Sequence, residues 1–409
     1  MNETGFFQGG NTMQFVRTKD LKPGMRLAKP IYNKSGVLLY ERDTKLTLQG
    51  INSIENFNLI GIFVLEPAEP LPPLSKEDLE FEQFQTIYLF KLRENIELLQ
   101  QGKQPETLPD LAQDIMLRYG KLDHKMNFTQ NLRSSADFIF KHAISTAILC
   151  AMISNVMGLS HPEKSILVHA ALLYDLGYLT VPITLLDKGN KITEEEKATI
   201  QLHLEKGYRL LRPEYNDYRL PQASLELIHA FIFKDHYRTE VPAELPQIVK
   251  KLLPVLNVAV TFDKLTAMNL NQTPLSEVAA MRRLFVLPDL YASNVVRALA
   301  ECIHILPTGC CIDLSNGEKA LVLEENPSDF ARPLILDFAT NRVLDLSDDK
   351  IYEEFHVKDI MKTMDNRIQI DEDTLKQFSA DEHIRELAEK FHRAKREGAA
   401  QRAKQILSK

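Results

Sequence analysis

The first 66 residues alternate short apolar runs with turn-forming clusters. The runs cover residues 15–16, 26–28, 31–32, 37–40 and 62–65, each about as long as a short strand. Lysine, proline, asparagine and glycine separate several of them, as in tight turns. Between the last two runs, apolar residues recur at every third position from Leu48 to Phe57, which predicts a helix. The pattern predicts a small β-rich or α+β domain over residues 1–66.

A proline-rich segment follows, and the pattern then becomes helical. Four prolines within residues 66–74 forbid a helix, so we expect a stiff linker at residues 67–75. From residue 76 to residue 306 apolar positions keep a helical period, clearest over residues 81–99, 110–119 and 194–211. Residues 136–157 are apolar around most of the circumference. They predict a buried central helix within a helical domain at residues 76–306.

Strand-like runs return after Pro307. Residues 311–314, 320–323 and 334–338 form apolar runs that are typical of strands, and Ser315-Asn316-Gly317 is typical of a hairpin turn. These features predict a β extension at residues 307–350, followed by a charged helical tail at residues 351–409. A narrow apolar stripe in that tail comprises Ile384, Leu387, Ala388 and Phe391. A solvated terminal helix is the favoured interpretation, and a docked helix is the alternative.

Composition narrows the class of protein. The 409 residues carry a formal net charge of −7, which argues against binding to nucleic acid polymers or to anionic membranes. We expect no apolar run of the roughly 18 residues needed to span a bilayer and find no signal-like N-terminus, so neither a membrane span nor secretion is expected. The four cysteines show no metal-binding or disulfide spacing. We therefore expect a cytoplasmic protein with reduced thiols.

Polar residues interrupt the apolar helices at four places where a core would favour leucine. His142 lies on the 136–157 helix, Asp175 ends the next apolar helix, and His203 and His229 lie on two later helices. Three imidazoles and one carboxylate on successive inward faces could hold a divalent ion such as Fe, Mn, Zn or Mg. Each histidine could equally be a satisfied core residue. The residues alone leave these two interpretations open.

The order of these residues resembles the HD-GYP family, which comprises metal-dependent cyclic di-GMP phosphodiesterases of the HD superfamily. The resemblance rests on His142, on residues 174–189 with their Tyr174-Asp175 pair, and on His203 with Gly207. It extends over about residues 130–350, and the N-terminal unit is similar to the small domain that often precedes such modules. It implies a mainly α fold, an HD-superfamily helical bundle between a small N-terminal β-rich domain and a β-hairpin-bearing C-terminal extension.

The departures from this family concern its chemistry. Tyr174 stands where the family has the histidine of its His-Asp pair, which leaves Asp175 as a remnant of the catalytic site. Phe138 stands at the position of the family's first carboxylate, Tyr178 at that of its phosphate-binding lysine, and Ala230 at that of its second histidine. Val260 replaces a later ligand aspartate. The segment from Asn269 to Gln272 replaces the stretch whose arginine binds substrate phosphates in the family. The Gly-Tyr-Pro signature is absent from residues 234–242. Two adjacent cations need bridging carboxylates, and only Asp175 remains of those that the resemblance assigns.

The sequence therefore favours a degenerate HD-GYP-like signalling protein that binds cyclic di-GMP or a signalling protein and does not hydrolyse its ligand. No cofactor is expected in this interpretation, and Tyr174 fills the former metal space with its hydroxyl bonded to Asp175. Lys234, Arg238 and Lys264 are weak candidates for binding a phosphate. One alternative is an active phosphodiesterase with a single divalent metal on His142, Asp175, His203 and His229. Another is a pure interaction scaffold, and a homodimer is left open.

Overall fold

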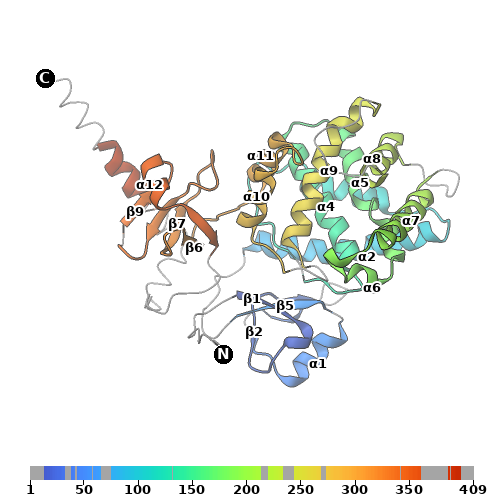
Figure 1. Cartoon of the computed structure of the whole chain (residues 1–409), viewed down its shortest axis with the longest axis horizontal. Helices are drawn as coiled ribbons and strands as arrows, with labels where there is room; N and C mark the ends of the chain where they lie inside the picture. Colours follow the sequence, from blue (N-terminus) through green and yellow to red (C-terminus); the bar gives the residue numbers. More distant parts are fainter. Residues whose placement is uncertain are drawn as a thin grey trace. The chain divides into compact units, whose positions relative to one another are not determined.

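The computed structural model describes residues 13–32, 38–41, 44–57, 59–65, 75–130, 132–212, 220–233, 244–268, 273–340, 342–360, 386 and 388–397. Its contacts divide the chain into two compact units, Gln14–His304 and Ile305–Lys409 together with Met1–Met13. Both units are drawn in Figure 1, and the class is mainly α with small antiparallel sheets, as the sequence predicts.

The N-terminal part of the first unit is a small α+β arrangement. Its elements are β1 (Met13–Arg17), η1 (Thr18–Asp20), β2 (Arg26–Leu27), β3 (Ile31–Tyr32), β4 (Leu38–Tyr40), α1 (Leu48–Asn56) and β5 (Gly61–Leu65). The strands form one sheet in the order β1-β5-β2 and a separate β3-β4 pair. Each predicted apolar run coincides with one of these strands. Leu132 and Met268 of the helical part share the core of this arrangement with Leu27, Ile54 and Ile62. The predicted linker falls largely outside the described residues.

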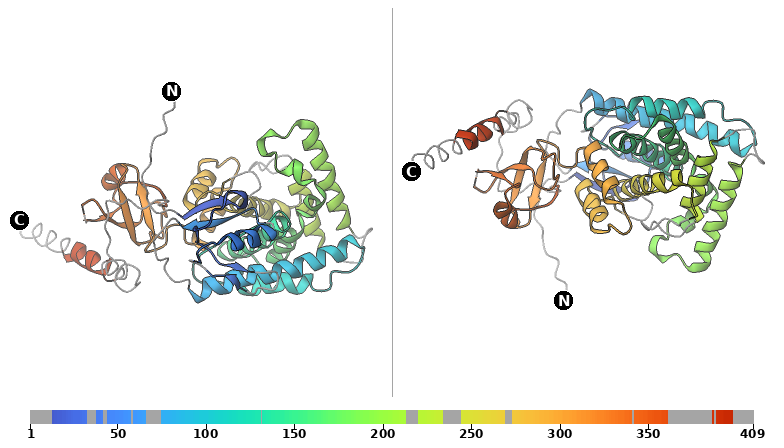
Figure 2. Two further views of the ribbon diagram at one scale, coloured as in Figure 1. Left: turned by 90° about the horizontal axis from the view of Figure 1, so that it is seen from below. Right: turned by 90° about the horizontal axis from the view of Figure 1, so that it is seen from above.

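The helical part surrounds α4, which Figures 1 and 2 show in the interior of the bundle. The helices are α2 (Lys76–Gln100), α3 (Leu108–Arg118), α4 (Phe138–Val156), α5 (His161–Leu173), η2 (Leu176–Thr180), α6 (Ile183–Leu186), η3 (Gly189–Lys191), α7 (Glu194–Leu210), α8 (Gln222–Phe233), α9 (Gln247–Thr266), α10 (Glu277–Val286) and α11 (Ser293–Cys302). Helices α2, α5, α9 and α11 all pack on α4. An all-round apolar helix needs such enclosure, which confirms the predicted central helix.

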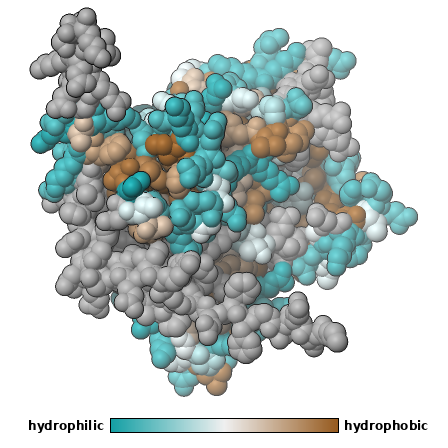
Figure 3. All heavy atoms as spheres, turned by 60° about the vertical axis from the view of Figure 1, so that its left-hand side comes forward, coloured by the Kyte–Doolittle hydropathy of each residue, from teal (hydrophilic) through white to brown (hydrophobic). Residues whose placement is uncertain are grey.

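Helix α4 is also long and apolar enough to cross a membrane by length and composition alone. Within the window that passes this test, 78% of the residues are buried inside the bundle, as in the core helix of a globular domain. Figure 3 shows hydrophilic side chains over much of one face, with smaller hydrophobic patches among them. Scattered exposed apolar residues of this kind are ordinary on a protein surface. The cytoplasmic location and the homodimer stay predictions.

Two glycines let the turn after Asp175 lie directly against α7. A Cβ atom on Gly207 would lie 2.3 Å from the backbone nitrogen of Gly177, and one on Gly177 would lie 2.4 Å from the Cα of Leu204. Only glycine permits so close an approach of two backbones. The predicted capping box at the start of α7 is present, with reciprocal hydrogen bonds between Thr193 and Glu196. These contacts set the position of the segment that carries Asp175.

The second unit contains a five-stranded antiparallel sheet. Its elements are β6 (Cys311–Leu314), β7 (Lys319–Glu324), β8 (Leu334–Asp337), β9 (Arg342–Asp345), α12 (Asp349–Glu354) and β10 (Val357–Ile360), and the strand order is β10-β6-β7-β8-β9. The three predicted strands and the turn at Gly317 are confirmed. Strands β9 and β10 were not expected, and β10 lies where the sequence predicted a helical tail. Pairing with β6 supplies the backbone partners that these four residues would lack as an isolated segment.

The C-terminal helix corrects the preference for a solvated tail. Ala388 is 4% exposed and packs against Leu321 and Leu336 of the sheet, together with Phe391. His392 Nε2 lies 2.8 Å from a carboxylate oxygen of Glu324, which adds a polar contact at the edge of this core. The described part of the stripe, Ala388 and Phe391, therefore covers one face of the sheet, because an open antiparallel sheet must bury its apolar face against another element.

Candidate functional site

A carboxylate on α9, Asp263, is the centre of a buried polar cluster in the helical part. Its side chain is fully buried, and Arg133 Nη2 donates to its two oxygens at 2.7 and 2.9 Å. Gln130 Nε2 donates to Oδ1 at 3.0 Å, and His142 Nδ1 forms a short contact with Oδ2. A carboxylate without water needs such donors, since leaving an ion buried and unpaired is costly. Asp263 therefore has charged or polar partners on both oxygens.

The electrostatics of the cluster keep Asp263 ionised. Burial by itself raises the pKa of the Asp263 carboxyl, but the positive charge of Arg133 and then the interactions with His142 outweigh it. The net result is a pKa lowered from 3.8 to about 2. Because the carboxylate can only accept hydrogen bonds, His142 must carry a proton on Nδ1. The Asp263 charge therefore sets which ring nitrogen of His142 is protonated.

The N-terminal part holds the segment that delivers Arg133 to Asp263. The backbone nitrogen of Ile60 donates to the carbonyl oxygen of Arg133 at 2.8 Å. Lys29 Nζ donates to the carbonyl oxygen of Gln130 at 2.9 Å. Both bonds join strand-region residues to the 130–133 segment, far apart in sequence. The small α+β part thus helps to position an arginine in the core of the helical bundle.

The second ring nitrogen of His142 faces the Tyr174-Asp175 pair. The hydroxyl of Tyr174 lies 2.5 Å from Nε2, and Asp175 Oδ2 lies 3.6 Å from the same atom. With the proton on Nδ1, Nε2 accepts the hydrogen bond that the phenol donates. The sequence predicted a bond from Tyr174 to Asp175, and the hydrogen bond found here goes to His142. Both nitrogens of His142 therefore have close partners from this chain.

Asp175 ends the α5 segment at its turn into η2 and is almost fully buried, at 6% exposure. Its Oδ1 atom has no hydrogen-bond partner among the described residues. The Tyr174 ring beside it packs edge-on against Phe231 with ring centroids 4.9 Å apart. An unpartnered buried carboxylate oxygen is rare in folded proteins, and Oδ1 keeps the capacity to accept a hydrogen bond or to contact an ion.

The other two predicted ligands lie in different surroundings. His203 on α7 is half-buried, and its Nδ1 lies 2.8 Å from the hydroxyl of Thr180. His229 on α8 is exposed and stacks on Phe233 with ring centroids 4.5 Å apart. The next residue, Ala230, is the buried one. The structure therefore brings together His142 and Asp175 but keeps His203 and His229 in separate contacts.

The remaining predicted site positions are partly described. Val260 is buried on α9 and Phe138 begins α4 half-buried. Lys264 Nζ lies 5.8 Å from the centre of the Tyr178 ring, within cation–π range. Lys234, Arg238, Asn269 and Gln272 lie outside the described residues.

Sequence reasoning missed Arg133, Gln130 and Asp263 as members of the cluster. A signal for Asp263 existed, because it is an acid on a helix whose neighbours Phe262, Val260 and Ala259 are all apolar. The same reasoning that singled out Asp175 would have found it. Nothing local marks Arg133, which precedes α4 in a non-helical segment.

The described side chains do not fit a divalent metal ion of the kind that the resemblance implies. Within the ranges given above, no three His, Cys, Asp or Glu side chains lie together in a way that could hold one. Of the four predicted ligands, His142 and Asp175 approach each other, and Nε2 of His142 is bonded to Tyr174. Protein zinc sites draw on three or four such ligands. Tyr174 therefore occupies the direction in which His142 would bind a metal.

Comparison with known proteins finds an HD domain in the helical part. Residues 127–228 match the model of a family described as the HD domain. The chain is 25% identical over 215 residues to a cyclic di-GMP phosphodiesterase of Pseudomonas aeruginosa, covering 52% of this chain and 50% of that protein. It is 28% identical over 165 residues to a cyclic di-GMP phosphodiesterase response regulator of Xanthomonas campestris, covering 39% of this chain and 40% of that one. Residues 127–228 therefore form an HD domain, and the named relatives support the HD-GYP type for this chain.

Two further matches are more distant or cover a shorter part of the chain. An HDG“Y”P protein of Bdellovibrio bacteriovorus has a solved structure that aligns with a TM-score of 0.40 and 14% identity, over 70% of this chain and 97% of that chain. A 3′3′-cGAMP-specific phosphodiesterase of Vibrio cholerae is 29% identical over 86 residues, which cover 21% of this chain and 16% of that protein. The chain spans about half the length, or less, of the curated relatives it matches.

Proposed function

We propose that this chain is a degenerate HD-GYP protein, which binds cyclic di-GMP or a signalling protein without hydrolysing its ligand. The observation that supports this proposal best is the state of His142. Both of its ring nitrogens are engaged by side chains of the protein, Nδ1 by Asp263 and Nε2 by Tyr174. A histidine ligates a metal through a free ring lone pair, so the Tyr174 hydroxyl competes directly with any ion.

The electrostatics of the cluster support the same proposal. The charge of Asp263 is neutralised by Arg133 at 2.7 Å, so it does not attract a cation as an unpaired carboxylate would. Asp175 is then the nearby carboxylate that could still bind an ion. Two adjacent cations would need several carboxylates to offset their mutual repulsion. Val260, at the place where the resemblance puts a ligand aspartate, is buried and apolar. Among the described residues, the ligands that two paired metals would need for hydrolysis of a phosphodiester are not gathered at this place, which supports the proposal.

The ligand in this proposal comes from the relatives and from the charges near the turn after Asp175. The two relatives with the longest alignments are named as cyclic di-GMP phosphodiesterases. Lys264 and Tyr178 lie together at this end of the bundle, where a cation and an aromatic ring could hold a guanine or a phosphate. A nucleotide bound here would act as a signal that the protein senses.

A single-metal phosphodiesterase is the competing candidate, and one observation favours it. Asp175 Oδ1 is buried and has no partner among the described residues, as would be expected of an oxygen that meets an ion. The donor set nevertheless fails for such an ion, since His142 Nε2 is bonded elsewhere and His203 and His229 have other contacts. We therefore derive no catalytic step through a metal.

Calorimetric titration with cyclic di-GMP, paired with chromatography of the same mixture, tests the proposal. The expected result is saturable heat of binding and unchanged nucleotide after incubation with Mn²⁺ or Fe²⁺ under anaerobic, reducing conditions. Linear dinucleotide or GMP among the products would refute the loss of catalysis. No heat at high micromolar nucleotide would refute cyclic di-GMP as the ligand and leave the protein-partner or scaffold interpretation.

Two substitutions at one position sharpen this test. Tyr174→His rebuilds the His-Asp pair and removes the hydroxyl that is bonded to His142 Nε2. We therefore expect measurable binding of one divalent ion. Tyr174→Phe removes the hydroxyl without adding a ligand and serves as the matched control. Elemental analysis of the purified proteins compares the two. Stoichiometric metal in the wild-type protein would contradict the proposal and support the competing candidate.

A further inference from the structure

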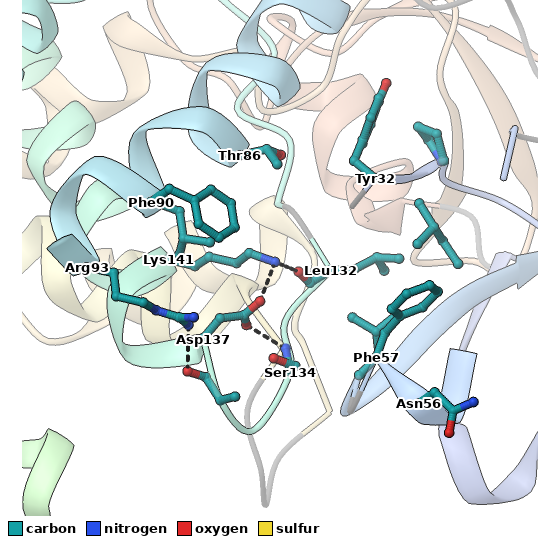
Figure 4. Close-up of a pocket in the computed structure, with 15 residues that line it drawn as sticks. Tyr32, Asn56, Phe57, Thr86, Phe90, Arg93, Leu132, Ser134, Asp137 and Lys141 are labelled. Atoms are coloured by element: carbon teal, nitrogen blue, oxygen red, sulfur yellow. Dashed lines mark hydrogen bonds and ion pairs between the residues drawn. The ribbon is translucent and has the colours of Figure 1, made fainter. Parts of the chain in front are cut away.

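A cavity of about 400 Å³ lies between the N-terminal α+β part and the helical part, both within the first compact unit. Figure 4 shows Tyr32 and Phe57 on one side and Phe90, Arg93 and Lys141 on the other. Small-molecule sites in proteins typically measure about 300–1,000 Å³ and combine apolar walls with a few convergent polar groups. This cavity has both properties, and it is separate from the Asp175 turn.

The walls of the cavity are apolar and partly aromatic. The apolar side chains that line it are Pro30, Ile31, Phe57, Leu59, Leu89, Phe90, Leu132 and Ala136. Aromatic residues with few rotatable bonds present flat contact area at little entropic cost. Such walls suit an apolar body of about the size of one ring.

The charges in the lining do not cancel. Lys141 Nζ pairs with Asp137 Oδ2 at 2.9 Å and also donates to the carbonyl oxygen of Leu132. The other oxygen of Asp137 accepts from the backbone nitrogen of Ser134 at 2.6 Å. The only acidic residue of the lining is therefore engaged on both oxygens. Its charge is offset by Lys141, so among the side chains of the lining Arg93 adds one uncompensated positive charge.

Arg93 is held in place but is not neutralised. Its Nη2 donates to the carbonyl oxygen of Ala136 at 3.1 Å, and its guanidinium lies over the Phe140 ring at 4.9 Å. Among the described residues it forms no ion pair with a carboxylate. A guanidinium has five N–H donors in a fixed planar fork that matches a carboxylate. Most of these donors are left for a ligand, while the Phe140 ring and the Ala136 carbonyl orient them.

The geometry points to a binding site for a small organic monoanion, a carboxylic acid with an apolar, ring-sized body. The carboxylate would pair with the Arg93 guanidinium, and the body would lie against Phe57, Phe90 and Leu89. Cyclic di-GMP does not suit this cavity, because it carries two phosphates and two purines against one uncompensated charge. The site is therefore independent of the function proposed above.

The lining of the cavity lies next to the buried cluster along the chain. Leu132 and Ser134 in its lining flank Arg133, which pairs with Asp263, and Lys141 precedes His142 on α4. Ligand contacts to Phe57 and Arg93 would bridge the N-terminal part and α2. A bridging ligand binds the folded state alone, so it raises thermal stability in proportion to the logarithm of its concentration.

Fluorine NMR with 4-fluorobenzoate as the probe tests the site in the full-length protein. We expect saturable line broadening with the wild-type protein, and at least tenfold weaker binding of neutral 4-fluorobenzamide, which has nearly the same shape. Arg93→Gln should weaken 4-fluorobenzoate binding at least tenfold, while Arg93→Lys should retain part of it. Lys91→Gln removes a positive charge from the same helix outside the cavity lining and should bind as the wild type does.

Three outcomes would overturn the inference. They are no binding of 4-fluorobenzoate at about 10 mM, equal binding of the acid and the amide, and unchanged binding by Arg93→Gln. Circular dichroism of each variant establishes that it folds. If Arg93→Gln does not fold, the binding of 4-fluorobenzoate by Arg93→Lys, weaker than that of the wild type or equal to it, tests the role of Arg93. Excess cyclic di-GMP should leave the fluorobenzoate signal unchanged. Displacement of the probe by that nucleotide would contradict an independent site, whatever the fate of the proposed function.

Discussion

Two sides of the same helical bundle differ in the burial and the contacts of their polar residues. Around α4 and α9, His142, Asp263, Arg133 and Tyr174 are buried and bonded to one another. Around α7 and α8, His203 and His229 reach the surface and contact a threonine hydroxyl and an aromatic ring. The contrast shows that an order of residues that resembles a family does not by itself define a single site. Because the first group is buried, we expect substitutions there to lower the free energy of unfolding strongly. Because the second group reaches the surface, we expect substitutions there to have little effect.

Removing the central carboxylate should have the largest effect. Asp263→Ala leaves Arg133 and His142 buried without their common partner, and breaking a buried ion pair costs about 3–5 kcal/mol. Urea unfolding at neutral pH measures the loss in the free energy of unfolding. Asp263→Asn, which keeps the shape and one acceptor, should lose less. If Asp263→Ala unfolds within 1 kcal/mol of the wild type, the cluster does not stabilise the fold in the manner described.

Acid should weaken the same side of the bundle. The pKa of Asp263 falls from 3.8 in the unfolded chain to about 2 in the folded protein. A lowered carboxyl pKa gives stability that is present above pH 4 and is lost as the pH falls towards 2. The shift corresponds to about 2 kcal/mol. Comparing the pH dependence of unfolding between wild type and Asp263→Asn isolates this contribution, and identical curves below pH 4 would contradict it.

Tyr174→Phe should have an intermediate effect on stability. It deletes the hydroxyl that bonds to His142 Nε2 at 2.5 Å while keeping the ring packed against Phe231. A buried acceptor that loses its donor costs about 1–3 kcal/mol. Thermal unfolding of the variant measures this loss. An unchanged midpoint, with the ring still packed, would mean that Nε2 finds another partner.

His203→Ala and His229→Ala should have the smallest effects. Both side chains are at least partly exposed. His203 contacts the Thr180 hydroxyl, and His229 packs on the rings of Phe233 and Tyr208. Surface substitutions of this type change the free energy of unfolding by about 0.5 kcal/mol or less. Denaturant unfolding of the two variants provides the comparison with His142→Ala, for which we expect a loss several times larger. A large loss at His203 would place it in a structural cluster that the described contacts do not include.

Local sequence patterns predicted much of the fold because they depend on near neighbours. The capping box at Thr193 and the all-round apolar character of α4 are such signals, and both are present in the structure. Strand β10 and the docked C-terminal helix were missed for the opposite reason. The four residues of β10 form a strand through pairing with β6, more than forty residues earlier, and Ala388 is buried only because the sheet has an open apolar face.

The sequence by itself determined that Tyr174 precedes Asp175 at the end of an apolar helix, since both facts are read from neighbouring positions. The tertiary structure alone decided what that pair does. It placed His142 opposite Tyr174 and brought Asp263 and Arg133, which are 130 positions apart, into one ion pair. A buried charge is tolerated only where a partner meets it, and that meeting depends on how whole helices pack. The buried acid that the sequence singles out therefore lies beside a cluster organised by a different carboxylate, Asp263.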